Sequence, residues 1–317
     1  MDVFLAQPRG FCAGVTRAIE IVERALELHG APVYVFHEIV HNQWVVNSLR
    51  ERGAVFVDQL QDVPIGSVVV FSAHGVADAV VREAQSRQLH HIDATCPLVS
   101  KVHQQVRRFA ARGMPLVMIG HAGHEEVVGT TGQVQAPVHL VSQVEDVAHL
   151  PLPQGSPLAY VTQTTLSLDD TRSIVDALQQ RFEALGPHTD DICYATQNRQ
   201  TAVRAMASQV DVVLVVGARN SSNSRRLQEV AERAGVTSLL VQDAGDITDS
   251  QRERWRSLGL RIGITAGAST PELLVRQVVQ HLQEPDDRPA TQLDGVKEDV
   301  SFRLPPGLGA AVPRHGR

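Results

Sequence analysis

The sequence predicts an α/β protein built from three related small α/β domains with mainly parallel sheets. Three observations carry this prediction: short apolar runs, polar or glycine-rich loops directly after them, and a weak internal repeat around the cysteines. Parallel strands that are covered by helices on both faces have continuous apolar sequences of this kind, rich in Val, Ile and Leu. In chain order the runs are Val33–Phe36, Val68–Phe71, Leu116–Ile119, Val212–Val216 and residues 262–265.

Polar loops rich in His, Gly, Ser, Thr and Asn follow many of the expected strands. In open α/β sheets, ligands bind beyond the carboxyl ends of the strands. The polar residues therefore lie where a binding site is expected. The loops occupy residues 72–75, 120–124, 163–165, 217–223 and 266–269.

The internal repeat is centred on Cys12, Cys96 and Cys193, each of which precedes an amphipathic stretch. The cysteines lie 84 and 97 residues apart, which is close to the length of one small α/β unit. We therefore expect three units that meet at a common centre. The expected domains are residues 1–96, 97–192 and 193–283, followed by a C-terminal extension over residues 284–317. Within this extension, residues 300–304 alternate like a short strand, and a mobile tail follows.

Composition excludes several classes of protein. The chain has 29 basic and 35 acidic residues, so it carries no overall positive field that would attract nucleic acid or anionic lipid. The sequence contains no leader pattern and no apolar run of membrane-spanning length, so we expect a cytoplasmic protein with neither a nucleic-acid nor a membrane partner. Three distant cysteines are an odd number, which makes a disulfide framework improbable.

The cysteines are candidate metal ligands because each is expected at a helix N-terminus. There the free N–H groups and the helix dipole favour the thiolate, which is the form that binds metal. Three thiolates on an iron–sulfur cubane would leave one iron without a protein ligand, which could then act as a Lewis acid. Buried thiols without a ligand, and zinc held by three cysteines and a histidine, remain alternatives at this point.

Six short motifs stand out along the chain, at residues 8–15, 93–97, 163–167, 191–200, 220–224 and 265–271. They resemble motifs of the 4-hydroxy-3-methylbut-2-enyl diphosphate reductase (LytB) family. This resemblance implies a trefoil of three α/β domains around a central [4Fe-4S] cluster. It also implies the last step of the non-mevalonate isoprenoid pathway, a two-electron, two-proton reduction that gives isopentenyl and dimethylallyl diphosphates.

The resemblance also implies roles for individual residues. The cluster ligands would be Cys12, Cys96 and Cys193. The residues around the substrate diphosphate would be His41, His74, His124, Thr164, Ser221, Ser222, Asn223 and Ser269. The serines and the asparagine after residue 216 follow an expected strand and open a helix, where N–H groups and hydroxyls can bind an anion.

Loss of the hydroxyl as water needs a proton donor, and the matching residue is Glu126. A carboxyl group shielded from solvent can stay protonated near neutral pH. Thr164 would support it by a hydrogen bond to the carboxyl group or to the substrate hydroxyl. The family usually has proline where this chain has Glu125, which leaves open which glutamate faces the pocket.

Three other functions agree less well with the sequence. A zinc hydrolase would use His121, His124 and Glu125, but their spacing differs from the metalloprotease motifs. A nicotinamide dehydrogenase would need a Gly-x-Gly-x-x-Gly loop after an early strand, which is absent, so electrons would come from an external donor such as ferredoxin or flavodoxin. A non-catalytic iron–sulfur sensor or scaffold would need neither the diphosphate loops nor Glu126.

Overall fold

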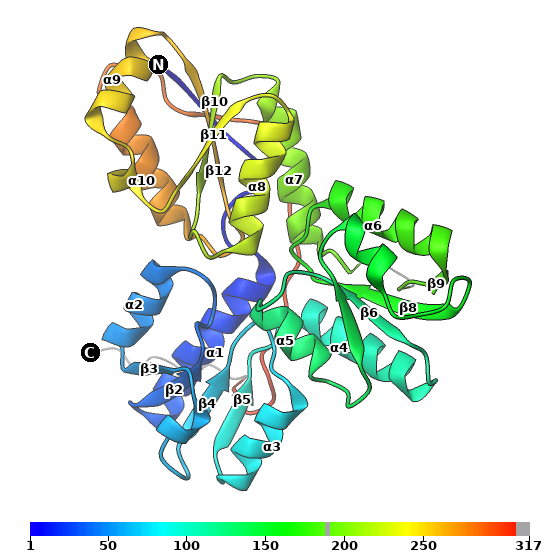
Figure 1. Ribbon diagram of the computed structural model, residues 1–317. Coiled ribbons are helices and arrows are strands. Elements are labelled where there is room, and N and C mark those ends of the chain that lie inside the picture. The colour runs from blue at the N-terminus through cyan, green and yellow to red at the C-terminus, as the bar shows by residue number, and fades with distance from the viewer. Residues whose placement is uncertain (188–190, 309–317) are drawn as a thin grey trace.

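The computed structural model describes residues 1–187 and 191–308 and has three parallel sheets, each covered by helices. The sheets form three lobes around a common centre, so the architecture is a trefoil and the predicted fold class is confirmed (Figure 1). The Val-rich runs become strands because both faces of each sheet are covered. Strands β6 (Leu116–Ile119) and β10 (Val212–Val216), for example, are buried along their whole length.

The first lobe contains a four-stranded sheet in the order β3-β2-β4-β5. Its strands alternate between two cores, with Val35 and Val70 on one face and Phe36 and Phe71 on the other. The strands are β2 (Val33–Phe36), β3 (Ala54–Val57), β4 (Val68–Phe71) and β5 (His90–Asp93). The helices are α1 (Ala13–His29), α2 (Gln43–Glu51), the 3₁₀ helix η1 (Leu60–Asp62) and α3 (Asp78–Ser86).

The second lobe repeats this order as β7-β6-β8-β9. Val117 and Ile119 of β6 pack toward one core, and Leu116 and Met118 pack toward the other. The remaining strands are β7 (Val138–Val141), β8 (Pro157–Thr162) and β9 (Glu183–Leu185). The helices are α4 (Pro97–Ala111), α5 (Glu125–Thr131), the 3₁₀ helix η2 (Val144–His149) and α6 (Leu168–Arg181).

The third lobe has five strands in the order β11-β10-β12-β1-β13. Its first four strands follow the pattern of the other two sheets, except that the chain's first strand takes the fourth place. The strands besides β10 are β1 (Asp2–Leu5), β11 (Thr237–Val241), β12 (Arg261–Ala266) and β13 (Thr291–Gln292). The helices are α7 (Tyr194–Ala207), α8 (Ser222–Arg233), the 3₁₀ helix η3 (Ala244–Asp246), α9 (Asp249–Ser257) and α10 (Glu272–Leu282).

The strands of one sheet do not all come from one of the expected domains. Strand β1 pairs with β12 in the third lobe, whereas α1, which follows it, packs in the first. The expected strand over residues 300–304 is also not formed. The extension instead adds β13 beside β1 and then crosses to the first lobe, where Leu308 packs in the core and Arg17 donates to the Arg303 carbonyl. The domain boundaries remain a prediction, and the expected mobile tail falls largely on residues 309–317, outside the described part of the chain.

A topological switch point lies near the centre of each sheet. The chain leaves β2, β6 or β10 toward one edge and returns to the other side of that strand as β4, β8 or β12. Crevices at such points, outside the carboxyl ends of the strands, are the usual binding sites of open α/β sheets. Three of them are therefore available to one central site.

A buried ion pair joins the C-terminal extension to the third lobe. Arg199 on α7 is fully buried, and its guanidinium contacts the Glu298 carboxylate at 3.1 Å. The same guanidinium donates to the Gly10 carbonyl at 2.7 Å, two residues before Cys12. Glu298 of the extension thus neutralises Arg199, and Arg199 in turn holds the loop before Cys12 in place.

We predict that Glu298→Ala lowers the free energy of unfolding by about 3 kcal/mol, because it leaves the Arg199 charge buried and unpaired. Anaerobic denaturant unfolding would measure the change. The matched control is Glu253→Ala, an exposed carboxylate on α9, which we expect to change stability by less than about 0.5 kcal/mol. Equal effects of the two substitutions would contradict the assignment.

Candidate functional site

The three lobes enclose one pocket at the centre of the molecule. It is lined by loops that follow the strands on both sides of every switch point and by the first residues of α1, α4 and α7. All of the predicted site residues lie on its wall: Cys12, His41, His74, Cys96, His124, Glu126, Thr164, Cys193, Ser221, Ser222, Asn223 and Ser269. The fold therefore brings together residues that lie up to 257 positions apart in the sequence.

The three cysteines occupy equivalent positions in the three lobes. Cys12, Cys96 and Cys193 are the N-cap residues of α1, α4 and α7, and their carbonyls accept the first bonds of these helices. Each cysteine N–H is in turn donated to a carbonyl just after β12, β4 or β8, at 3.1, 3.0 and 3.1 Å. One hydrogen bond therefore fixes each helix start to the end of a neighbouring strand.

The thiol groups of Cys96 and Cys193 are costly to ionise in this pocket. Burial raises the pKa of Cys96 to about 12, and the nearby Cys12 thiol adds to the effect. Burial likewise raises the pKa of Cys193 to about 11. Buried thiolates need a cation to offset their charge. The donor set is therefore suited to a metal centre, since three clustered sulfurs would together favour a cationic partner.

Gly14 makes room beside these sulfurs. A Cβ atom at this helical position would lie 2.7 Å from the Cys96 sulfur and 3.8 Å from that of Cys12. Real Cβ atoms do not approach a neighbour as closely as the first of these distances. Only glycine at residue 14 leaves the sulfurs in their positions.

Three histidines meet on another wall of the pocket. The rings of His41 and His74 are stacked, with centroids 4.3 Å apart and planes inclined by 23°. The His124 ring stands edge-on to both, with centroids at 5.8 and 5.9 Å. The three lie in loops that follow β2, β4 and β6. Together they offer several ring nitrogens to one ligand.

The N-terminus of α8 forms a further wall of the pocket. Its N-cap residue Ser221 accepts a hydrogen bond from the Ser224 N–H at 3.4 Å. Asn223 is only 4% exposed, yet neither its side-chain oxygen nor its nitrogen has a hydrogen-bond partner. Because a buried amide without partners is unfavourable, this side chain is available to a bound ligand. The Ser269 hydroxyl, by contrast, donates to the His41 carbonyl at 3.0 Å and ties two lobes together.

Glu126 is the buried acid of the pocket, with 2% of its surface exposed. One carboxyl oxygen accepts the Thr164 N–H at 2.6 Å, and the other accepts the Thr164 hydroxyl at 3.0 Å. Burial outweighs both bonds and raises the pKa of Glu126 to about 7. The carboxyl group can therefore hold a proton near neutral pH.

Comparison with known proteins identifies the family. A profile of the LytB protein family matches residues 3–283. The chain belongs to the LytB family. It is 56% identical over 312 residues to 4-hydroxy-3-methylbut-2-enyl diphosphate reductase 2 of Bradyrhizobium diazoefficiens, covering 98% of this chain and 100% of that protein. It is 54% identical to the reductase of an Enterobacter species over 97% of this chain and 98% of that one.

Solved structures agree with this assignment to the LytB family. The E-1-hydroxy-2-methyl-but-2-enyl-4-diphosphate reductase of Plasmodium falciparum superposes with a TM-score of 0.90 at 38% identity, covering 97% of this chain and 96% of that one. A second structure, of (E)-4-hydroxy-3-methyl-but-2-enyl diphosphate reductase, described as the terminal enzyme of the non-mevalonate pathway, gives a TM-score of 0.63 at 30% identity. That superposition covers 89% of this chain and 99% of that one.

Two pocket residues of this LytB protein, Thr165 and Gly14, were not among the predicted site residues. Thr165 lines the pocket, accepts a bond from the Gln163 side chain at 2.9 Å and donates to the Ser222 hydroxyl at 3.1 Å. It follows β8 as His74 follows β4, so the internal repeat could have indicated it. The role of Gly14 depends on a contact across 82 residues, for which the sequence contains no signal.

The histidine motif of a zinc hydrolase is not assembled. His121 and His124 diverge: the His121 ring accepts from Arg226 at 2.6 Å, and the Nδ1 atom of His124 accepts from the Glu126 N–H at 3.1 Å. Glu125, whose position was open, lies against His74 rather than in the place of Glu126. The buried acid beside Thr164 is therefore Glu126.

We predict that the infrared band of a protonated carboxyl group titrates with a midpoint near pH 7 and is lost in Glu126→Gln. The pKa of Glu126 rises from 4.5 to about 7 on folding, so the folded state holds this proton between these values and releases it above them. Stability that comes from this proton is thus lost as the pH rises from about 4.5 to about 7. Asp191→Asn, which removes another buried carboxyl group, is the control and should keep the band. A band that persists in Glu126→Gln would refute the assignment.

Proposed function

We propose that the chain holds a [4Fe-4S] cluster on Cys12, Cys96 and Cys193 and reductively removes the hydroxyl group of 4-hydroxy-3-methylbut-2-enyl diphosphate. Two electrons and two protons convert the substrate to water and to isopentenyl or dimethylallyl diphosphate. One observation carries the proposal: three thiols, a buried carboxyl group and the unpaired amide of Asn223 line the same pocket in a member of the LytB family.

The cluster proposal rests on the donor set and its surroundings. Three sulfurs from three lobes offer three ligands, so a cubane would keep one iron without a protein ligand. Helix N-termini at all three cysteines favour bound thiolates, and Gly14 leaves space between two of them. When bound, such a cluster supplies electrons and a Lewis-acidic position at the substrate hydroxyl.

The polar side of the pocket would bind the diphosphate. Ser221, Ser222 and Asn223 combine short hydroxyls and an amide with the N–H groups at the start of α8, where the helix dipole favours an anion. Ring nitrogens of the three histidines supply further donors. Interactions with the non-reacting diphosphate would hold the hydroxyl end of the substrate close to the cysteines.

Glu126 would deliver the proton to the leaving hydroxyl group. Its carboxyl group is buried, holds a proton near neutral pH and lies on the pocket wall. Thr164 donates two hydrogen bonds to it and so fixes its orientation. A buried acid with this pKa suits general acid catalysis, whereas a sensor or scaffold would have no use for it.

Electrons would come from a separate redox protein such as ferredoxin or flavodoxin, since the chain has no dinucleotide-binding loop. Among the described residues, no helix is both long and apolar enough to cross a bilayer. Iron and sulfide analysis after anaerobic purification, together with turnover of the allylic diphosphate, would test the proposal.

We predict that Cys96→Ser loses iron, sulfide and turnover together, whereas Glu126→Gln keeps the cluster and loses turnover by at least about 100-fold. The amide of the glutamine fits the same space but cannot supply a proton at neutral pH. Metal analysis and product formation with a chemical reductant would separate the two effects. Full activity of Glu126→Gln would remove it as the proton donor, and stoichiometric zinc without sulfide would overturn the cluster.

We predict that Gly14→Ala lowers the iron content although it favours the helix. Alanine has a higher helix propensity than glycine, but its Cβ at this position in the first turn of α1 would displace the Cys96 sulfur. Iron and sulfide per chain, with circular dichroism to confirm the helices, would check this. Thr16→Ala, an exposed change on the same helix, should keep the cluster. An unchanged iron content in Gly14→Ala would show that the sulfurs need not hold these positions.

A further inference from the structure

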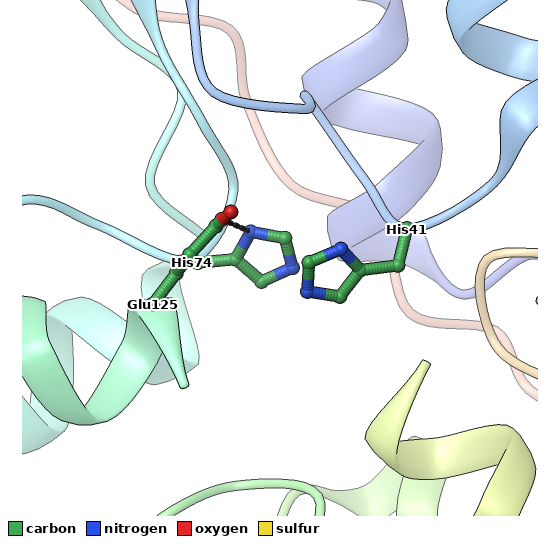
Figure 2. Close-up of side chains that lie close together, drawn as sticks. All are labelled: His41, His74 and Glu125. Carbon is green, nitrogen blue, oxygen red and sulfur yellow. Dashed lines mark ion pairs between the residues drawn. The ribbon is translucent and has the colours of Figure 1, made fainter. Parts of the chain in front are cut away.

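Two of the pocket histidines are paired with carboxylates that no proposed step uses. Figure 2 shows the Glu125 carboxylate against the His74 ring, with an oxygen 2.7 Å from Nδ1, and the His41 ring facing that of His74. On the far side, the Nδ1 atom of His41 lies 3.1 Å from a Glu38 oxygen. Asn220 donates to the same Glu38 oxygen at 3.1 Å and holds it in place. Each stacked ring therefore has its own carboxylate.

The third histidine is held differently. The Nδ1 atom of His124 accepts the backbone N–H of Glu126 at 3.1 Å. Since that nitrogen is an acceptor, the ring proton must be on Nε2. Burial lowers the pKa of His124 to about 3, so the ring remains neutral. His124 can donate Nε2–H to an anion without taking up a proton.

The same reasoning gives the opposite result for His41 and His74. A carboxylate against Nδ1 requires a proton on that nitrogen, because a bare lone pair there would repel it. The neutral ring then has no proton left for Nε2. To donate from Nε2 to an anion while Nδ1 keeps its carboxylate, the ring must become a cation. For these two rings, anion binding and protonation are coupled.

We propose that Glu125 and Glu38 are positioning residues that couple diphosphate binding to proton uptake by His74 and His41. This inference rests on the proposed function, because it takes the ligand of the pocket to be a diphosphate. In the free pocket the stacked rings would repel each other as cations. A bound diphosphate supplies the negative charge that allows both rings to be protonated, while the carboxylates stabilise and orient the cations.

The charge states fit this order of events. Burial lowers the pKa of His74 below its ordinary value, against the opposing effect of Glu125, so the ring is neutral before ligand binds. Burial by itself would raise the pKa of Glu125, but the contact with His74 lowers it to about 2. The bond from His41 similarly lowers the pKa of Glu38. Both carboxylates are thus charged at neutral pH, and the neutral His74 ring is the group beside Glu125 that can gain a proton.

A metal ion is the other ligand that this corner could attract. Single ligand atoms of His41, His74 and Glu125 lie within 4.8 Å of one another. The rings, however, are stacked with nearly parallel planes, so their in-plane lone pairs do not converge on one point as tetrahedral or octahedral coordination requires. The Nδ1 atoms of both rings are also engaged with carboxylates. The geometry favours hydrogen bonding to an anion.

Calorimetry with inorganic pyrophosphate tests the coupling without turnover. The anaerobic, cluster-containing protein is titrated at pH 8 in two buffers of different ionisation enthalpy, which gives the number of protons taken up. We expect about one proton fewer for Glu125→Gln and for Glu38→Gln than for the unsubstituted protein. Protonation of the ligand itself cancels in this comparison.

Two further variants serve as a second test of Glu125 and as a control. Glu125→Pro also removes the carboxylate, and proline fits the first position of α5 without loss of the helix, so it should lower the uptake like Glu125→Gln. Glu253→Gln removes an exposed charge far from the pocket and should leave the uptake unchanged.

The outcomes separate the inference from the proposed function. Pyrophosphate binding with equal proton uptake in all variants would overturn the coupling and leave the reductase proposal intact. Binding that is abolished by a chelator would favour the metal site and also overturn the coupling. If the unsubstituted protein does not bind pyrophosphate, the diphosphate site itself fails, and the coupling fails with it.

Discussion

The structure depends on one hydrogen bond that occurs three times. In every lobe a cysteine N–H is donated to the carbonyl of a residue that follows a buried parallel strand: Ala268 for Cys12, Ala73 for Cys96 and Thr164 for Cys193. Each bond fixes the N-terminus of a helix in one lobe to the end of a strand in another lobe, namely α1 to β12, α4 to β4 and α7 to β8. Because each lobe contributes one such arrangement, the three sulfurs reach the same pocket although no two are close in sequence. Binding residues lie at the same strand ends, with histidines in the first and second lobes and the hydroxyl and amide groups of Ser221, Ser222 and Asn223 in the third.

Charge in the pocket is arranged by burial and pairing. No cationic group pairs with Glu126 in the described part of the chain, so burial favours its neutral form and makes it a proton carrier. Glu125, the adjacent residue, turns toward His74 and remains ionised. Two neighbouring glutamates thus differ in protonation because the helix start points one inward beside Thr164 and the other toward an imidazole. Each charge state suits a distinct task, proton delivery in one case and ring orientation in the other.

Much of the fold could be predicted, because parallel strands buried on two faces leave a strong apolar signal. The runs at β2, β4, β6, β10 and β12 all became strands. The signal failed where local sequence does not decide pairing. The first strand pairs with β12 in the third sheet, and residues 300–304 form no strand because the chain there runs against the first lobe, where the Arg17 side chain donates to the Arg303 carbonyl.

The sequence by itself determined which residues could form a site, because motif chemistry and strand-end loops are local properties. It singled out the cysteines, the histidines, the N-terminus of α8 and Glu126 before any contact was known. Only the tertiary structure decided the contacts between lobes: Glu125 with His74, Asn220 with Glu38, and the space that Gly14 leaves for the Cys96 sulfur. Such pairings depend on how three separately folded sheets are packed together. Distances across lobes are set by that packing, and no spacing along the chain encodes them.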